Sequence, residues 1–427
     1  MRKIVPNCSK ILAGVLLTTL LAACGSKEGE TTAISSQNPQ VFYSHSVAMS
    51  SDSVYSWGVN TYGQLGHDGI TAKSTPKPVT IEADDGTPIA INGVSAGGTH
   101  TLAFGVAADP VYAWGNNGFG QLGNNSTTAS TKPVKVRIDS TADPAFLTGI
   151  TAVAAGWDHS LALKSGAVWA WGNNRQGQLG LGDVTPEINQ RSFAVPAISP
   201  VNANVTMIAA GGSYNLALSS DKTVRSWGYN KSGQLGQGLD THKIPTPGKV
   251  VTAAGGSELP NVIHIAAGGS HSLFVDGDHK VWACGLNNFG QLGDGSFKKE
   301  FVAVPVLKDK DSDEQLTGAI AVAAGLGHSL ALIDGNVWAW GNNDSGQLGD
   351  NSTTTRTTPV QVLTNETGHP PLDNIIKIVA IGNHSFALES GGHLWAWGEN
   401  TYGQLGNGKK IDSPYAIEVT GISNPGL

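Results

Sequence analysis

The sequence predicts an all-β fold in which one chain forms a single toroidal domain of repeated units. Periods near 50 residues are typical of propellers and solenoids. The composition agrees, because 56 of the 427 residues are glycine and only 14% are charged, as expected for many short strands joined by tight turns. The tetrapeptide Gly-Gln-Leu-Gly recurs every 56 or 57 residues, beginning at Gly63, Gly120, Gly177, Gly233, Gly290, Gly346 and Gly403.

Each repeat contains a predicted β-hairpin, which is clearest in residues 154–180. Large residues alternate with small ones before a turn at 164–166, and Trp169 and Trp171 alternate with small residues after it. A period of two is the strand period. We expect the bulky leucines and tryptophans to share one face of each unit and to pack on the small face of the next. About four strands per unit fit within 57 residues.

The N-terminus is predicted to be a lipoprotein signal peptide, residues 1–23. Three basic residues precede an apolar run at 11–23 that is too short to span a bilayer. The run ends in Leu21-Ala22-Ala23-Cys24, which resembles the bacterial lipobox. We therefore expect cleavage before Cys24 and acylation of that residue, for example with palmitate, to give a membrane anchor. An ordinary signal peptide with a chance cysteine is the alternative.

The segment after the cleavage site, residues 24–40, is rich in Ser, Thr, Gly and Glu and is predicted to be a flexible tether. Ser26 stands where an Asp would favour retention at the inner membrane. The predicted location is therefore extracytoplasmic, in the bacterial cell envelope, and by analogy with Gram-negative sorting it is the outer membrane if the cell is Gram-negative.

Charge and cysteine content exclude some classes of function. Loss of the leader leaves 23 basic against 33 acidic side chains, a formal charge of −10. No basic stripe remains to neutralise phosphates, so nucleic-acid binding is not expected. Cys284 would be the one cysteine left inside the domain, so no internal disulfide is expected. No cofactor motif was found, and we expect a monomer.

The repeat resembles the regulator of chromosome condensation repeat, with the pattern A-G-x-x-H-S-L-A-L … V-x-A-W-G-x-N-x-x-G-Q-L-G in seven copies over roughly 41–420. Members of that family are seven-bladed β-propellers, so the resemblance implies such a propeller over residues 41–427. The first copy lacks the strand before its histidine, and 419–423 resembles 147–151. We expect the N- and C-terminal segments to pair and close the ring, so that no edge strand stays exposed.

The hairpin geometry predicts which loops lie together. The start of one strand lies beside the end of its antiparallel partner, so the loop before His-Ser-Leu and the loop Gly-x-Asn-x-x-Gly share one rim, here called rim A. Aromatic residues occupy positions of rim A that differ between repeats, and such residues anchor protein partners. Covering the ends of the blade cores is the alternative role. These residues are Tyr43, Tyr62, Phe119, Trp157, Tyr214, Phe289 and Tyr402.

A histidine recurs at one position in six repeats. A ring of sevenfold spacing spreads such side chains too widely to bind one metal ion, so no metal site is expected. We expect structural hydrogen bonds to the neighbouring turn. In exchange factors of the family, histidines matching this motif lie on the partner-binding face, which leaves rim contacts as the alternative. The residues are His45, His100, His159, His271, His328 and His384.

Three classes of function remain from the sequence. The first, which we favour, is a membrane-anchored recognition module that binds a protein or an envelope polymer through one rim. The second is guanine-nucleotide exchange, which the family resemblance suggests but which requires a small GTPase. The third is a propeller enzyme such as a polysaccharide lyase. Because the histidines repeat instead of marking one site, we expect no enzyme and no catalytic residues.

Overall fold

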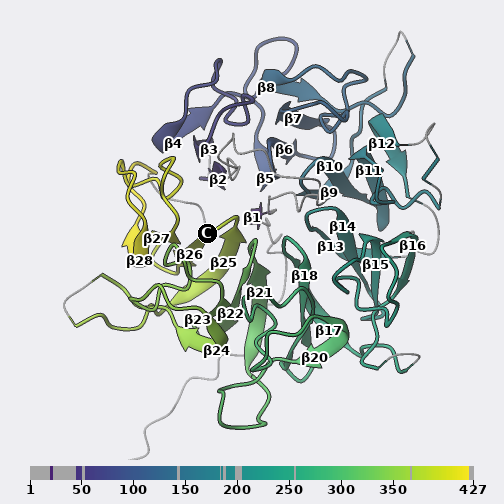
Figure 1. Cartoon of the computed structure of the whole chain (residues 1–427). Helices are drawn as coiled ribbons and strands as arrows, with labels where there is room; N and C mark the ends of the chain where they lie inside the picture. The colour runs from purple at the N-terminus through teal and green to yellow at the C-terminus, as the bar shows by residue number, and fades with distance from the viewer. Residues whose placement is uncertain are drawn as a thin grey trace, which may run out of the picture.

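The computed structural model describes residues 20–22 and 45–422, except 51–52, 142–144, 183, 186–188, 198–203, 254–255 and 366–367. Seven small β-sheets surround a central channel, and the chain runs around the ring from the first blade to the seventh (Figure 1). The described residues contain strands and turns but no helix. The prediction of an all-β, seven-bladed propeller is therefore confirmed.

Blades 2 to 7 each contain four antiparallel strands, whereas blade 1 contains three within the described residues. In every blade the first strand lies innermost and the last lies at the outer edge (Figure 1). The strands are, from blade 1 to blade 7, β2 (His45–Met49), β3 (Val54–Gly58), β4 (Lys73–Val79); β5 (Ile91–Ala96), β6 (His100–Gly105), β7 (Val111–Gly115), β8 (Ser130–Lys135); β9 (Ile150–Ala155), β10 (His159–Lys164), β11 (Ala167–Asn173), β12 (Gln190–Pro196); β13 (Val205–Ala210), β14 (Tyr214–Ser219), β15 (Val224–Tyr229), β16 (Lys243–Lys249); β17 (Val262–Ala267), β18 (His271–Asp276), β19 (Val281–Gly285), β20 (Glu300–Pro305); β21 (Ala319–Ala324), β22 (His328–Ile333), β23 (Asn336–Gly341), β24 (Arg356–Gln361); β25 (Ile375–Ile381), β26 (His384–Glu389), β27 (Leu394–Gly398) and β28 (Ser413–Glu418).

One further short strand belongs to the predicted leader. β1 (Leu20–Ala22) pairs in parallel with the inner strand of blade 2, β5. The rest of the leader, Cys24 and the tether lie outside the described residues, so the predicted lipid anchor stays a prediction. In the part of the chain that the structure describes, no helix is long and apolar enough to cross a membrane.

The faces of the blades differ from the prediction in one respect. In the β10–β11 hairpin, Ser160 pairs with Trp171 and Leu161 pairs with Ala170. Paired residues project from the same side of a sheet, so the buried tryptophan and the leucines lie on opposite faces. Trp171 packs into the core shared with blade 2, whereas Leu161 packs into the core shared with blade 4. The expectation that tryptophans and leucines share a face was wrong.

Blade 7 packs against blade 1 and closes the ring. Trp57 of blade 1 donates its indole hydrogen to the Gln404 carbonyl of blade 7, at 2.7 Å. Val419 and Ile422, beyond β28, pack against the apolar core between these two blades. Residues 423–427 and those before His45 lie outside the described part, so the pairing of the two terminal segments stays a prediction.

Candidate protein-binding rim

Rim A carries the loops predicted to lie together. Within blade 3, His159 at the start of β10 pairs with Gly172 at the end of β11, so both flanking loops emerge on the same side. The loops of adjacent blades are also joined there through their backbones. Gly98 N–H donates to the Gly156 carbonyl at 3.0 Å, and Trp157 N–H donates to the Gly212 carbonyl at 3.0 Å. Rim B, on the opposite side, carries the hairpin turns and the connections between blades.

The repeated histidines lie between neighbouring blades. His100 Nε2 lies 2.8 Å from Ser160 Oγ of the next blade, and this hydroxyl donates to the Gln121 carbonyl, also at 2.8 Å. The same carbonyl accepts a hydrogen bond from the Trp171 indole at 2.8 Å. Because the hydroxyl gives its own proton to the carbonyl, it accepts from the imidazole, and Nε2 carries the hydrogen. These three side chains and one backbone carbonyl join blades 2 and 3.

The arrangement recurs around the ring with different acceptors. In blade 4 Tyr214 replaces the histidine, and its hydroxyl donates to the His271 carbonyl of blade 5. The bond from His384 reaches blade 1, so the series of contacts has no gap. The other histidine Nε2 atoms lie 2.7 to 3.0 Å from their acceptors, in the pairs His45–Thr101, His159–Asn215, His271–Ser329, His328–Ser385 and His384–Ser46.

Burial keeps these histidines neutral. All six are fully buried, and no partner is found for their Nδ1 atoms among the described residues. Desolvation lowers the pKa of His45, His100, His328 and His384 to about 3. It lowers the pKa of His159 and His271 to about 4. The expected structural hydrogen bonding is thus found, although its acceptors are side chains of the next blade.

The alternative of rim contacts is wrong for the six histidines. Their position at the ends of strands suggested a place on rim A, but the side chains turn into the interfaces between blades and leave no surface for a partner. The prediction that Tyr214 contacts a partner on rim A is also wrong, because its side chain is fully buried and hydrogen-bonded to blade 5.

The Gly-Gln-Leu-Gly turn serves the same interfaces. In blade 3 the side-chain oxygen of Asn174 accepts from Leu179 N–H at 2.9 Å and holds the turn. Gly177 has φ of +78°, and a Cβ there would lie 2.6 Å from the Pro245 Cα of the next blade. Any side chain would therefore clash as well as strain the backbone. The repeated tetrapeptide is a scaffold element.

Cys284 occupies the tryptophan position in blade 5. Its thiol is buried 3.6 Å from the Gln234 carbonyl, where other blades place an indole N–H. Burial raises the pKa of the thiol. The side chain makes a small apolar contact and is not a reactive thiol.

Five of the predicted aromatic residues are described on rim A at or near the surface. Phe289 is 39% exposed and lies against Gly327 of the next blade. Phe119 is half-buried, with the Arg175 guanidinium 5.0 Å from its ring centroid. The rings therefore cover blade ends and also reach solvent. Tyr43 lies outside the described residues. The remaining three, all half-buried, are Tyr62, Trp157 and Tyr402.

The long loops of rim A carry apolar side chains that the sequence analysis missed. Ile70, Leu239, Phe297 and Ile411 are between 48% and 72% exposed. Each stands in a polar, glycine-containing loop between Gly-Gln-Leu-Gly and the outer strand. The presence of large apolar residues in such polar loops could have identified these exposed side chains from the sequence alone. They differ between blades, so the repeat does not require them.

The blade contacts and the closed ring define a β-propeller built from seven copies of one repeat. The regulator of chromosome condensation (RCC1) repeat model matches residues 51–104 and 109–163, and the RCC1-like domain model matches residues 140–424. The chain belongs to the regulator of chromosome condensation repeat family.

Similar proteins have varied roles. The ultraviolet-B receptor UVR8 of Arabidopsis thaliana is 31% identical over 389 residues, which cover 90% of this chain and 81% of the receptor. Human WBSCR16 has a similar structure, with a TM-score of 0.72, 24% identity and coverage of 87% of this chain and 96% of that one. Prp20p of Saccharomyces cerevisiae gives a TM-score of 0.68 at 24% identity, covering 88% and 87%. The structural matches show the shared fold.

Proposed function

We propose that this chain is a lipid-anchored binding module of the bacterial envelope that recognises a protein partner through rim A. One observation carries the proposal. Large hydrophobic side chains exposed in the described residues are concentrated on rim A, which holds five of eight. Two of the others, Ile320 and Ile376, line the central channel, and one, Val106, lies on rim B. Exposed apolar groups gathered on one face are typical of protein-binding surfaces.

The loop tips also suggest the chemistry of the partner. Phe297 is followed by Lys298 and Lys299, and Ile411 is preceded by Lys409 and Lys410. All six side chains are exposed. A protein with apolar pockets bordered by carboxylates fits these tips, and added salt is expected to weaken the complex. Prp20p, described with its binding to Gsp1p and histones, is a precedent for protein binding by this fold.

The first experiment compares partner capture from envelope extract by three forms of the chain. We expect Phe289→Ala/Phe297→Ala/Ile411→Ala to lose roughly tenfold or more in retained partner, because truncating interface anchors costs about 2 kcal/mol or more in total. Val106→Ala on rim B is the control and is expected to bind like the wild type. Equal capture by the triple variant, with an unchanged unfolding midpoint in both variants, would show that rim A is not the binding surface.

The second experiment tests the anchor. Cells treated with globomycin, which blocks lipoprotein signal peptidase, are expected to accumulate a heavier precursor that retains residues 1–23. The mature form from untreated cells should carry acyl chains on the fragment that contains Cys24, measured by mass spectrometry. A mature mass that does not change with treatment, or an unmodified Cys24, would show that the chain is not lipid-anchored. The proposal that rim A binds a partner does not depend on this result.

A further inference from the structure

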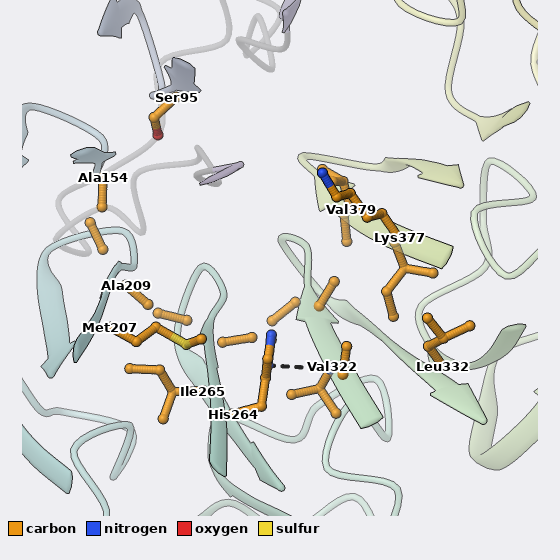
Figure 2. Close-up of a pocket in the computed structure, with 18 of the residues that line it drawn as sticks. Ser95, Ala154, Met207, Ala209, His264, Ile265, Val322, Leu332, Lys377 and Val379 are labelled. Carbon is orange, nitrogen blue, oxygen red and sulfur yellow. Dashed lines mark hydrogen bonds between the residues drawn. The ribbon is translucent and has the colours of Figure 1, made fainter. Parts of the chain in front are cut away.

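A groove opens on the outer side of the ring between blades 1 and 2. Its walls come from the chain around β4 of blade 1 and from β7 and β8 of blade 2, and β4 and β8 lie at the outer edges of their blades (Figure 1). The groove has a volume of about 770 Å³, within the roughly 300–1,000 Å³ typical of small-molecule sites. It is separate from the apolar cavity of the central channel, which inner-strand residues such as Met207, Ile265 and Val379 line (Figure 2).

Comparison between blades shows that a lysine in the wall of this groove is exceptional. Lys77 on β4 pairs with Ser56 on β3. Folding of the repeat does not require a lysine at this position, because the outer strands of the other six blades place a glycine or an aliphatic residue there. These residues are Val134, Val195, Gly248, Val304, Val360 and Ile417.

Tyr112 is a second exception in the wall of the groove. It is 3% exposed, and no hydrogen-bond partner is found for its hydroxyl among the described residues. Burial raises the pKa of Tyr112 to about 12, so the hydroxyl stays neutral and can donate. A buried hydroxyl without a partner is costly, and a ligand group that accepts its hydrogen would remove that cost. The equivalent side chains of the other six blades are all half-buried, namely Tyr55, Trp169, Arg225, Trp282, Trp338 and Trp395.

His67 adds a hydrogen-bond acceptor to the same wall. Its Nε2 lies 3.0 Å from Ser56 Oγ and 3.1 Å from the Lys77 carbonyl. Because the Ser56 hydroxyl gives its own proton to the Leu65 carbonyl, at 2.6 Å, Nε2 carries the hydrogen of the ring. Nδ1 is therefore an acceptor, and no partner is found for it in the described part of the chain. Burial is the largest cause of the lowered pKa of His67, and the ammonium groups of Lys73 and Lys77 add to it.

The charged residues of the groove include an excess of lysines. The described wall contains Lys73, Lys77 and Lys132 against Asp68 and Glu82. Lys132 pairs with Asp68 across the two blades at 3.1 Å, so these two charges offset each other. Within the described ranges, no ion pair is found for Lys73 or Lys77. The groove thus combines two ammonium groups for an anion with neutral and acidic groups that suit hydroxyls.

We propose that this groove binds a small phosphorylated sugar, with its phosphate group at Lys73 and Lys77. The terminal phosphate oxygens accept charge-assisted hydrogen bonds from both ammonium groups. Sugar hydroxyls donate as well as accept, so they provide partners for the Tyr112 hydroxyl, His67 Nδ1 and the Glu82 carboxylate. A dicarboxylate would offer these acceptors no hydrogen and would be repelled by Glu82. The site does not depend on the proposed role of rim A, because none of the apolar side chains assigned to partner binding is among the described residues of its wall.

The experiment measures calorimetric binding of glucose-6-phosphate, glucose and inorganic phosphate to the full chain, purified in a non-ionic detergent. We expect glucose-6-phosphate to bind roughly tenfold or more tightly than glucose, because glucose makes no charge-assisted hydrogen bonds to the lysines. Inorganic phosphate, which lacks the sugar hydroxyls, should also bind roughly tenfold or more weakly than glucose-6-phosphate.

Three variants test the contacts of the phosphate and of the sugar separately. Lys77→Gln should weaken binding of glucose-6-phosphate roughly tenfold. The matched control Lys310→Gln, at an exposed lysine between β20 and β21, should leave it unchanged. Tyr112→Phe removes only the hydroxyl and should weaken binding several-fold without lowering the midpoint of thermal unfolding, because that hydroxyl has no partner among the described residues.

Unfolding midpoints verify that each variant is folded. The proposal would be overturned by equal affinity for glucose-6-phosphate and glucose, or by equal affinity for glucose-6-phosphate and inorganic phosphate. An equal effect of the two lysine variants, unchanged binding by Tyr112→Phe, or no binding of glucose-6-phosphate at millimolar concentration would also overturn it.

Discussion

Lowering the pH from 7.5 to 5 is expected to unfold the propeller cooperatively, with a midpoint between about pH 5 and 6. Six fully buried histidines have pKa values of about 3 to 4 in the folded chain, whereas the unfolded chain returns them to about 6.5. A protonated ring would place a charge and an additional N–H donor inside an interface between blades.

The direction of this effect follows from proton binding. Because the folded pKa values are depressed, the unfolded chain binds more protons below about pH 6.5, so the stability present above that pH is lost as the pH falls toward 3 to 4. At pH 5.5 each histidine costs on the order of 1 kcal/mol, and six together cost several kcal/mol. Typical domain stabilities are about 5–15 kcal/mol, so the loss is of the same size.

Circular dichroism measures the midpoint temperature of thermal unfolding at intervals of half a pH unit. His393→Gln is the control, because this exposed histidine pairs with Glu418, which raises its pKa, and it lies outside the blade interfaces. Its pH profile should match that of the wild type. A midpoint temperature of unfolding that stays constant down to pH 4.5 would show that the buried histidines do not govern stability in acid.

The second large effect is expected from Trp171→Ala. This tryptophan is fully buried between blades 2 and 3, and its indole donates to the Gln121 carbonyl at 2.8 Å. Removal of a buried tryptophan costs about 3–5 kcal/mol. Urea unfolding should therefore shift to a distinctly lower midpoint.

Trp169→Ala is the matched comparison, with the same substitution two residues away on the same strand. Trp169 is half-buried, with the Lys164 ammonium group 5.8 Å from its ring centroid. We expect a loss of about 1 kcal/mol. Both side chains contact the core between blades 2 and 3, so equal losses of stability would show that depth of burial in this core does not set the stability of the ring.

The repeat allowed the fold to be predicted from the sequence. The strand period, the turn residues and the spacing of Gly-Gln-Leu-Gly predicted the hairpins, and the family resemblance implied seven blades. The error over Trp171 and Leu161 has a physical origin. Alternation within each strand assigns residues to two sides, but the pairing of Ser160 with Trp171 decides which sides match, and a one-residue change of register exchanges them.

The candidate site was predicted less completely. The sequence located the loops of rim A, and five of the predicted aromatic residues lie there, four of them half-buried and Phe289 exposed. It did not reveal that His100 turns inward, because its acceptor Ser160 lies 60 residues away in the next blade. It also did not direct attention to Phe297, whose loop has no repeated pattern. Exposure depends on how the whole ring packs.

The most direct test of a repeated scaffold with a variable binding rim is site-specific photocrosslinking in the native envelope. A photoreactive side chain replaces Phe297 on rim A in one form and Val106 on rim B in the other, two positions that are 58% and 50% exposed. We predict protein adducts from position 297 and none from position 106. Adducts from position 106 alone, or equal adducts from both, would contradict the assignment of binding to rim A.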